Sequence, residues 1–241
     1  MAVFLLFAAL VLVAVWTPWH ACAFAAFKSG GEGPARRTFF RKWVVTSLLL
    51  FGGGTLGALF LMGRLNQLWR LPPEFDSLAA PARAMGVTVL GTAAVVAVAA
   101  CAVVVAAVAS RERGRLPPAV FGDVEVLLPR DGAERVWAAV LSLSAGLTEE
   151  AAFRLLLPLL ITLAVGDAPL GMAASALAFG LAHLYLGWRG VAATTMAGVF
   201  LSLVYLAAGN LLAPIAVHVG TDWVGLLVLP RLVGWRRPAS P

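Results

Sequence analysis

Long runs of hydrophobic residues, separated by short polar segments, make up most of this 241-residue chain. A helix of about twenty apolar residues is long enough to cross the hydrocarbon core of a bilayer. The pattern therefore predicts an all-α protein, a polytopic membrane helix bundle of about seven transmembrane helices with its active site buried in the bundle. The predicted spans are 2–27, 43–62, 84–109, 133–165, 169–186, 189–207 and 211–229.

The segments between the spans are polar and rich in helix breakers. Residues 28–42 are predicted to form a polar loop, 63–83 a second loop, and 110–132 a charged surface connector. The span at 133–165 is longer than a bilayer requires. It is interpreted as either one long tilted helix or two pieces hinged at Gly146.

The composition excludes a soluble domain, because 61% of the residues are hydrophobic and only 12% are charged. The net charge of +6 comes from basic residues in the gaps between spans, which indicates membrane orientation rather than nucleic-acid binding. With the N-terminus outside, fourteen Lys and Arg residues fall on the cytoplasmic side and three on the other. We therefore expect an outside N-terminus and a cytoplasmic C-terminus.

Glu149, Glu150 and Arg154 interrupt this pattern, because they lie inside an apolar run. Each charge at the bilayer centre costs roughly 2.5–3.5 kcal/mol, so the three need compensation. Glu150 and Arg154 are spaced i, i+4 and can pair on one helix face. Glu149 lies about 100° around the helix and stays free for chemistry. An N-cap at Thr148 followed by two dipole-stabilised glutamates is the alternative, but it leaves Arg154 unexplained.

Three more ionisable residues lie in the last spans: His183, His218 and Asp222. Polar groups in a membrane gather in the bundle interior, so we expect one polar cavity formed by three helices. His183 lies near one end of its span and His218 near the opposite end of its own. Straight helices would separate the two in depth by about 10–15 Å. His20, near the end of the first span beside two tryptophans, is interpreted as an interfacial residue.

Three spaced motifs carry a resemblance to a known family. Glu149-Glu150-x-x-x-Arg154, Phe179-x-x-x-His183 and His218-x-x-x-Asp222 resemble the signature motifs of the CAAX protease and bacteriocin-processing (CPBP) family of intramembrane endopeptidases. The resemblance covers about residues 128–229. It predicts a catalytic bundle with a basic tail over 128–241, preceded by N-terminal helices and loops over 1–127, all within one integral membrane domain. The chain departs from the family at Leu155, where Gly is common, and at Asp222, where Asn is frequent.

The resemblance implies peptide hydrolysis by a glutamate-activated water. Glu149, in a weakly hydrated cavity, is the predicted general base, and His183 shares the water. His218 is predicted to donate to the oxyanion. Asp222 would orient His218 or, when protonated, donate a hydrogen bond itself.

Glu150 and Arg154 complete the predicted catalytic set by holding the helix, and Arg154 and Phe179 are the predicted substrate-binding residues. A metal-dependent version is also coherent, because zinc accepts the nitrogen and oxygen donors that this chain supplies. The metal ligands would be Glu149, His183, His218 and Asp222. The metal-free version is favoured. A divalent metal such as zinc is the possible cofactor, and none is required.

The predicted function is an intramembrane endopeptidase that cuts near the C-terminus of a membrane-associated or lipidated substrate. The predicted partners are a peptide or lipidated protein and the lipid bilayer, without nucleic acid. The Arg-rich, Ala-rich composition points to a bacterial inner membrane. The alternative function is a non-proteolytic transporter, immunity or scaffold protein that uses the buried charges as an ion or partner site.

Overall fold

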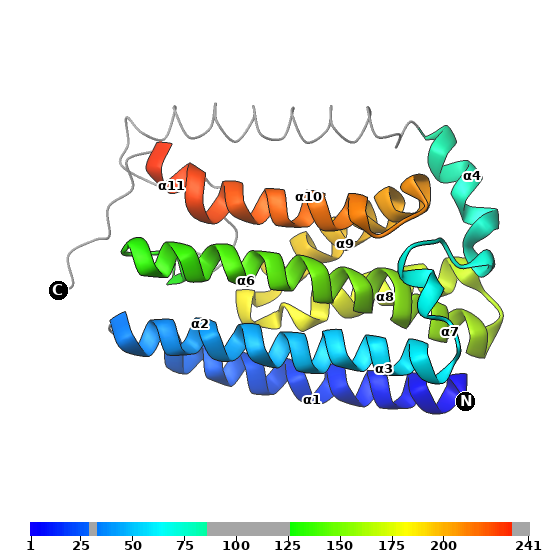
Figure 1. Ribbon diagram of the computed structural model, residues 1–241, viewed down its shortest axis with the longest axis horizontal. Helices are drawn as coiled ribbons and strands as arrows, with labels where there is room; N and C mark the ends of the chain where they lie inside the picture. The colour runs from blue at the N-terminus through cyan, green and yellow to red at the C-terminus, as the bar shows by residue number, and fades with distance from the viewer. Residues whose placement is uncertain (29–32, 86–125, 233–241) are drawn as a thin grey trace.

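The computed structural model describes residues 1–28, 33–85 and 126–232, and the regular elements in these ranges are all helical. Most of them run along the long axis of the molecule, with α1, α2 and α3 along one side, α6 in the middle against α2, and α10 on the far side of α6 (Figure 1). The α-helices are α1 (Ala2–Lys28), α2 (Gly33–Ser47), α3 (Gly54–Leu61), α4 (Asp76–Ala84), α6 (Gly132–Glu150), α7 (Leu157–Val165), α8 (Ala168–Ala182), α9 (Gly187–Ala208), α10 (Leu212–Trp223) and α11 (Leu229–Leu232). Of the predicted span 84–109 only residues 84–85 are described, and of the connector 110–132 only residues 126–132.

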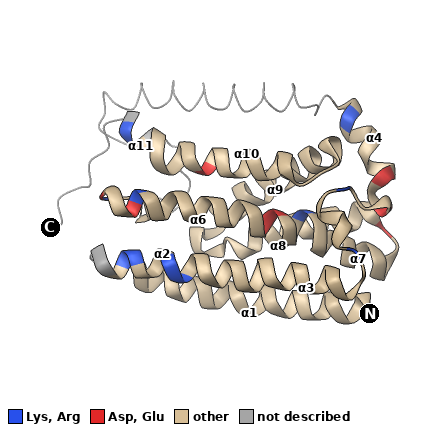
Figure 2. Cartoon of the chain, viewed as in Figure 1, with Lys and Arg blue, Asp and Glu red and all other residues tan. Residues whose placement is uncertain are grey.

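Within the described ranges, three helical stretches are long and apolar enough to cross a membrane: Ala2–Lys28, Ala35–Leu61 and Leu184–Ala208. Large apolar side chains such as Phe4 and Phe60 are exposed on the outside of the bundle, as expected where lipid is the solvent. Charged residues lie mostly towards the two ends of the bundle (Figure 2). The chain is therefore a multi-pass integral membrane protein.

The segment predicted as a polar loop over 28–42 is largely helical, so that expectation is wrong. α2 begins at Gly33 and continues through a π-helical stretch, η1 (Leu48–Gly53), into α3. The loop was predicted because hydropathy scores each basic residue as if it faced water. A basic residue that is neutralised by a buried partner can instead lie on a helix inside the bundle.

Arg36 on α2 provides the example. Its side chain is completely buried, and its Nε donates to both carboxylate oxygens of Glu134 on α6, at 3.0 and 3.1 Å. Its terminal nitrogens donate to the carbonyl groups of Val126 and Leu128. These bonds join α2 to the start of α6, the helix that carries the two central glutamates.

The apolar run at 133–165 forms one continuous helix rather than two hinged pieces. α6 passes into a π-helical turn, η5 (Ala151–Leu156), and then into α7. Pro158 has no N–H to bond the carbonyl of Arg154, which accounts for the widened turn just before it. Gly146 is a packing position: a Cβ there would lie 2.5 Å from Cγ2 of Val219, so the glycine lets α10 approach α6 closely.

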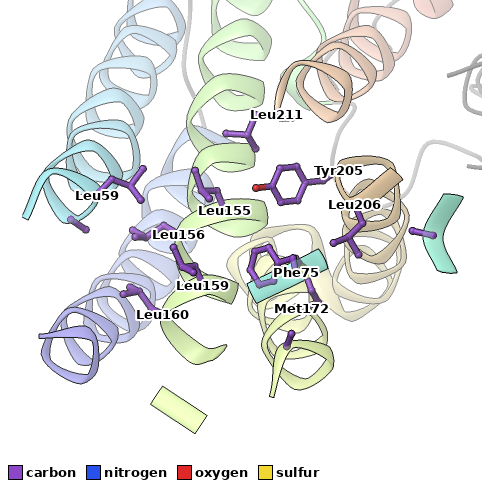
Figure 3. Packing of buried hydrophobic residues seen from close by; sticks show 13 residues of the cluster. Leu59, Phe75, Leu155, Leu156, Leu159, Leu160, Met172, Tyr205, Leu206 and Leu211 are labelled. Carbon is purple, nitrogen blue, oxygen red and sulfur yellow. The ribbon is translucent and has the colours of Figure 1, made fainter. Parts of the chain in front are cut away.

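An apolar cluster holds the η5–α7 region in place (Figure 3). Leu155, Leu159 and Leu160 are completely buried there against Tyr205 of α9 and Phe75. Phe75 belongs to a short 3₁₀ helix, η3 (Pro73–Phe75), in the segment between α3 and α4. This packing fixes the turn on which the central charges are carried.

Candidate active site

The adjacent glutamates at the end of α6 point to different partners. Glu150 is completely buried, and its Oε2 lies 3.0 Å from Nε of Arg154, so the predicted i, i+4 pair is confirmed. Its Oε1 lies 2.7 Å from Nδ1 of His218. Glu149 instead faces His183, with 3.9 Å between Oε2 and Nε2. Glu150 is thus held between Arg154 and His218 at short distance, whereas Glu149 has only His183 nearby, at a longer distance.

Arg154 lies under an aromatic ring. Its side chain is completely buried, and its guanidinium carbon is 4.2 Å from the centroid of the Phe179 ring. A guanidinium over an aromatic face is stabilised by the ring quadrupole. Nη1 and Nη2 have no hydrogen-bond partner within the described part of the chain. Substrate contact by Arg154 and Phe179 stays a prediction.

His183 ends α8 and precedes a short 3₁₀ helix, η6 (Leu184–Leu186). Its Nδ1 lies 2.8 Å from the carbonyl oxygen of Phe179, which can only accept, so Nδ1 carries the proton. In a neutral ring, Nε2 is then a free acceptor directed at Glu149. The 3.9 Å gap between Nε2 and Oε2 is too long for a direct hydrogen bond. One water at about 2.8 Å from each atom would bridge it.

His218 on α10 is oriented by Glu150 through the hydrogen bond at Nδ1. Its Nε2 lies 4.0 Å from Oδ2 of Asp222, beyond hydrogen-bond distance. The orienting hydrogen bond that the sequence assigned to Asp222 is therefore made by Glu150.

Glu149, His183, His218 and Asp222 line one cavity of about 270 Å³. Ser142 from α6 and Thr194 from α9 add hydroxyl groups to its wall. All four side chains therefore line one cavity, and their meeting at a single water-sized position stays a prediction.

The two histidines lie close together, without the separation of about 10–15 Å that straight, aligned helices would give. α8 has only 15 residues, about 22 Å of helix, so His183 lies at the end of a helix too short to cross a bilayer. The Phe179 ring lies between the histidines, 4.6 Å from His183 and 6.2 Å from His218, measured between centroids.

The metal-dependent alternative does not fit these side chains. Among the residues that the structure describes, no group of three His, Cys, Asp or Glu could hold a metal ion. No step of the chemistry is therefore derived through a metal.

Sequence reasoning missed two side chains beside Glu149: His20 and Tyr185. Both line a second, small cavity that Glu149 and His183 also line. His20 is buried among aromatic rings, including those of Trp43 and Tyr185, so its interpretation as an interfacial residue is wrong. Nothing in the local sequence links position 20 to position 149, because the contact depends on how α1 packs against α8 and η6.

Comparison with protein families finds a match in the second half of the chain. The model for Rce1-like proteins, described as type II CAAX prenyl endopeptidase Rce1-like, matches residues 132–224. That stretch runs from α6 into η7 (Val224–Val228) and contains all six predicted catalytic residues. Comparisons with curated proteins and with solved structures found no match. The members of the matched family are CAAX-type intramembrane peptidases, and residues 132–224 of this chain form an Rce1-like type II CAAX prenyl endopeptidase domain.

Proposed function

We propose that this protein is an intramembrane endopeptidase that hydrolyses a peptide bond near the C-terminus of a membrane-associated or lipidated substrate, using a water activated by Glu149. The observation that supports the proposal is the convergence of Glu149, His183, His218 and Asp222 on one cavity inside the bundle. A base, an acceptor and potential oxyanion donors in one cavity are what acyl-group hydrolysis needs.

In the proposed reaction, a water lies between Oε2 of Glu149 and Nε2 of His183. Glu149 takes one proton while the water oxygen attacks the peptide carbonyl carbon, and a tetrahedral oxyanion forms. His218, protonated and held by Glu150, donates its Nε2–H to that oxyanion. The proton on Glu149 then passes to the leaving nitrogen as the C–N bond breaks. The products are a carboxylic acid and an amine, and Glu149 returns to its starting state.

An apolar cavity supports the lipidated class of substrate. It has a volume of about 320 Å³ and lies between α1, α3 and η5, lined by residues such as Leu12, Gly57 and Leu156. Phe51 and Phe153 line both this cavity and the small one beside Glu149. An alkyl or isoprenoid chain attached to the substrate would be accommodated here, because burying each CH₂ contributes about 0.8 kcal/mol.

Glu149→Gln tests the proposal. Glutamine keeps the shape and hydrogen bonding of the side chain but cannot take a proton from water. We expect cleavage to fall at least about 10²-fold while folding is retained. The assay is detergent-purified protein with a library of lipidated and unlipidated membrane peptides, with products read by mass spectrometry, with and without a chelator.

Glu74→Gln is the matched control, because Glu74 pairs with Arg64 outside all three cavities and should leave cleavage unchanged. Cleavage that survives Glu149→Gln would remove Glu149 from the mechanism. Wild-type protein that cleaves no peptide but responds to an ion would support the non-proteolytic alternative instead.

A further inference from the structure

His20 in α1 lies next to the site without belonging to any of the three motifs. Its ring is almost completely buried, stacked on Trp16 with 5.0 Å between centroids. The ring of Trp43 is 4.3 Å away and that of Tyr185 4.9 Å away. Such a packed aromatic environment would suit a phenylalanine equally well, so the polar nitrogens of a histidine call for an explanation.

Two buried polar atoms beside the small cavity lack partners. Nε2 of His20 and Oε2 of Glu149 have no hydrogen-bond partner in the described ranges. Leaving a buried polar atom unpaired costs free energy, so native proteins pair nearly all of them with protein atoms or water. Both side chains line the same cavity, whose volume is about 10 Å³. That volume holds about one water.

The small cavity and the 270 Å³ cavity share four lining residues: Trp43, Glu149, His183 and Tyr185. The remaining walls differ. The small cavity is closed by α1 residues such as His20, and the large one by α9 and α10 residues such as Asp222. Glu149 and His183 therefore face α1 on one side and the large cavity on the other.

From this geometry we propose that His20 is a positioning residue of the hydrolytic site: its Nε2 and Oε2 of Glu149 hold one water between them. This inference rests on the proposed function, in which the substrate peptide occupies the large cavity. The water on the α1 side fixes the Glu149 carboxylate from the face opposite the peptide, so it does not compete for the space that the peptide and the attacking water take. α1, which lies outside the matched family domain, thereby contributes to the reaction.

His20→Phe keeps the stacked ring and removes both nitrogens. In the peptide assay we expect kcat to fall about tenfold, with KM changed less than about twofold, because one positioning hydrogen bond is lost and substrate contacts remain. His20→Gln, whose amide can reach the same water, should recover most of the rate. Trp19→Phe is the matched control, because Trp19 is exposed on the same helix and should behave like wild type.

A second measurement does not depend on activity. The chain has three histidines, so ¹⁵N-histidine NMR in detergent can assign each ring from single substitutions. Glu149→Gln should move the Nε2 resonance of His20, whereas Trp19→Phe should leave it in place. A His20 resonance that ignores Glu149→Gln would overturn the shared water. A moved resonance with unchanged kcat in His20→Phe would overturn the positioning role, and a moved resonance in a protein that cleaves nothing would refute the proposed function alone.

Discussion

Glu150 connects Arg154 on its own helix to His218 on α10, and all three side chains are largely or completely buried. A carboxylate between a guanidinium and an imidazole holds both groups in a fixed orientation, and their charges neutralise its own. Glu149, one residue earlier, is not held in this way, because its Oε2 comes only within 3.9 Å of Nε2 of His183. The two adjacent glutamates have different partners because successive residues of a helix are rotated by about 100°.

Arg154→Ala should destabilise the protein, because it leaves the buried carboxylate of Glu150 with His218 alone. Breaking a buried pair costs roughly 3–5 kcal/mol, which we expect as a lower melting temperature in detergent and lower expression. Arg135→Ala, at an exposed position of α6, should melt like wild type. If Arg154→Ala also melts like wild type, pairing is not its role and substrate contact gains support.

Substitutions of Asp222 test whether its side chain donates a hydrogen bond to the oxyanion. If it donates a hydrogen bond to the oxyanion when protonated, Asp222→Asn preserves a donor and should keep activity within about threefold of wild type. Asp222→Ala removes the donor and should lower kcat about 10²-fold, the usual loss for an oxyanion donor. Rates for both variants, measured on the same cleaved peptide, decide the matter. An inactive Asn variant together with an active Ala variant would contradict this role.

At the scale of the elements, short and irregular helices bring the site together. α8 ends at Ala182, and Gly180 near that end lets α9 pack closely, since a Cβ there would lie 1.8 Å from Oγ1 of Thr195. Ser175 on α8 donates to the carbonyl of Phe153 in the π-helical turn at 2.6 Å. These contacts hold His183 at the level of Glu149, inside the bundle.

The local part of this arrangement was predictable from the sequence, and the long-range part was not. Helical spacing was enough to pair Glu150 with Arg154 and to place His218 and Asp222 on one face. The bond from Glu150 to His218 spans 68 residues, and its existence depends on the register between two helices. Periodicity within one helix carries no information about that register, which is why the orienting role was assigned to Asp222.

Filling the apolar cavity beside α3 should weaken the binding of lipidated peptides. Gly57→Phe should fill it, because a Cβ at Gly57 meets nothing within 4 Å. We expect KM for lipidated peptides to rise at least about tenfold, while unlipidated peptides are cleaved as before. Leu56→Phe, at an exposed neighbouring position outside the cavity, is the control. Equal effects on both peptide classes would show that the cavity does not bind the lipid.

For the molecule as a whole, the buried polar site implies a defined position in the bilayer. Charged residues concentrate towards the two ends of the bundle (Figure 2). The sequence predicts an excess of basic residues on one side of the membrane. Arg36 belongs to that count although its side chain is buried against Glu134. Removing it from the count still leaves a large excess on the same side.

Orientation can therefore be tested directly in a variant whose Cys22 and Cys101 are replaced by serine. α6 begins at one end of the bundle, and the segment between α3 and α4 lies at the other (Figure 1). Ala133 and Asn66 are exposed positions in these two regions. We expect Asn66→Cys to react with a membrane-impermeant maleimide on intact cells and Ala133→Cys to react only after permeabilisation. The opposite pattern would place the N-terminus inside. Labelling of both positions from one side would contradict a bundle that crosses the membrane, because these positions lie at its opposite ends.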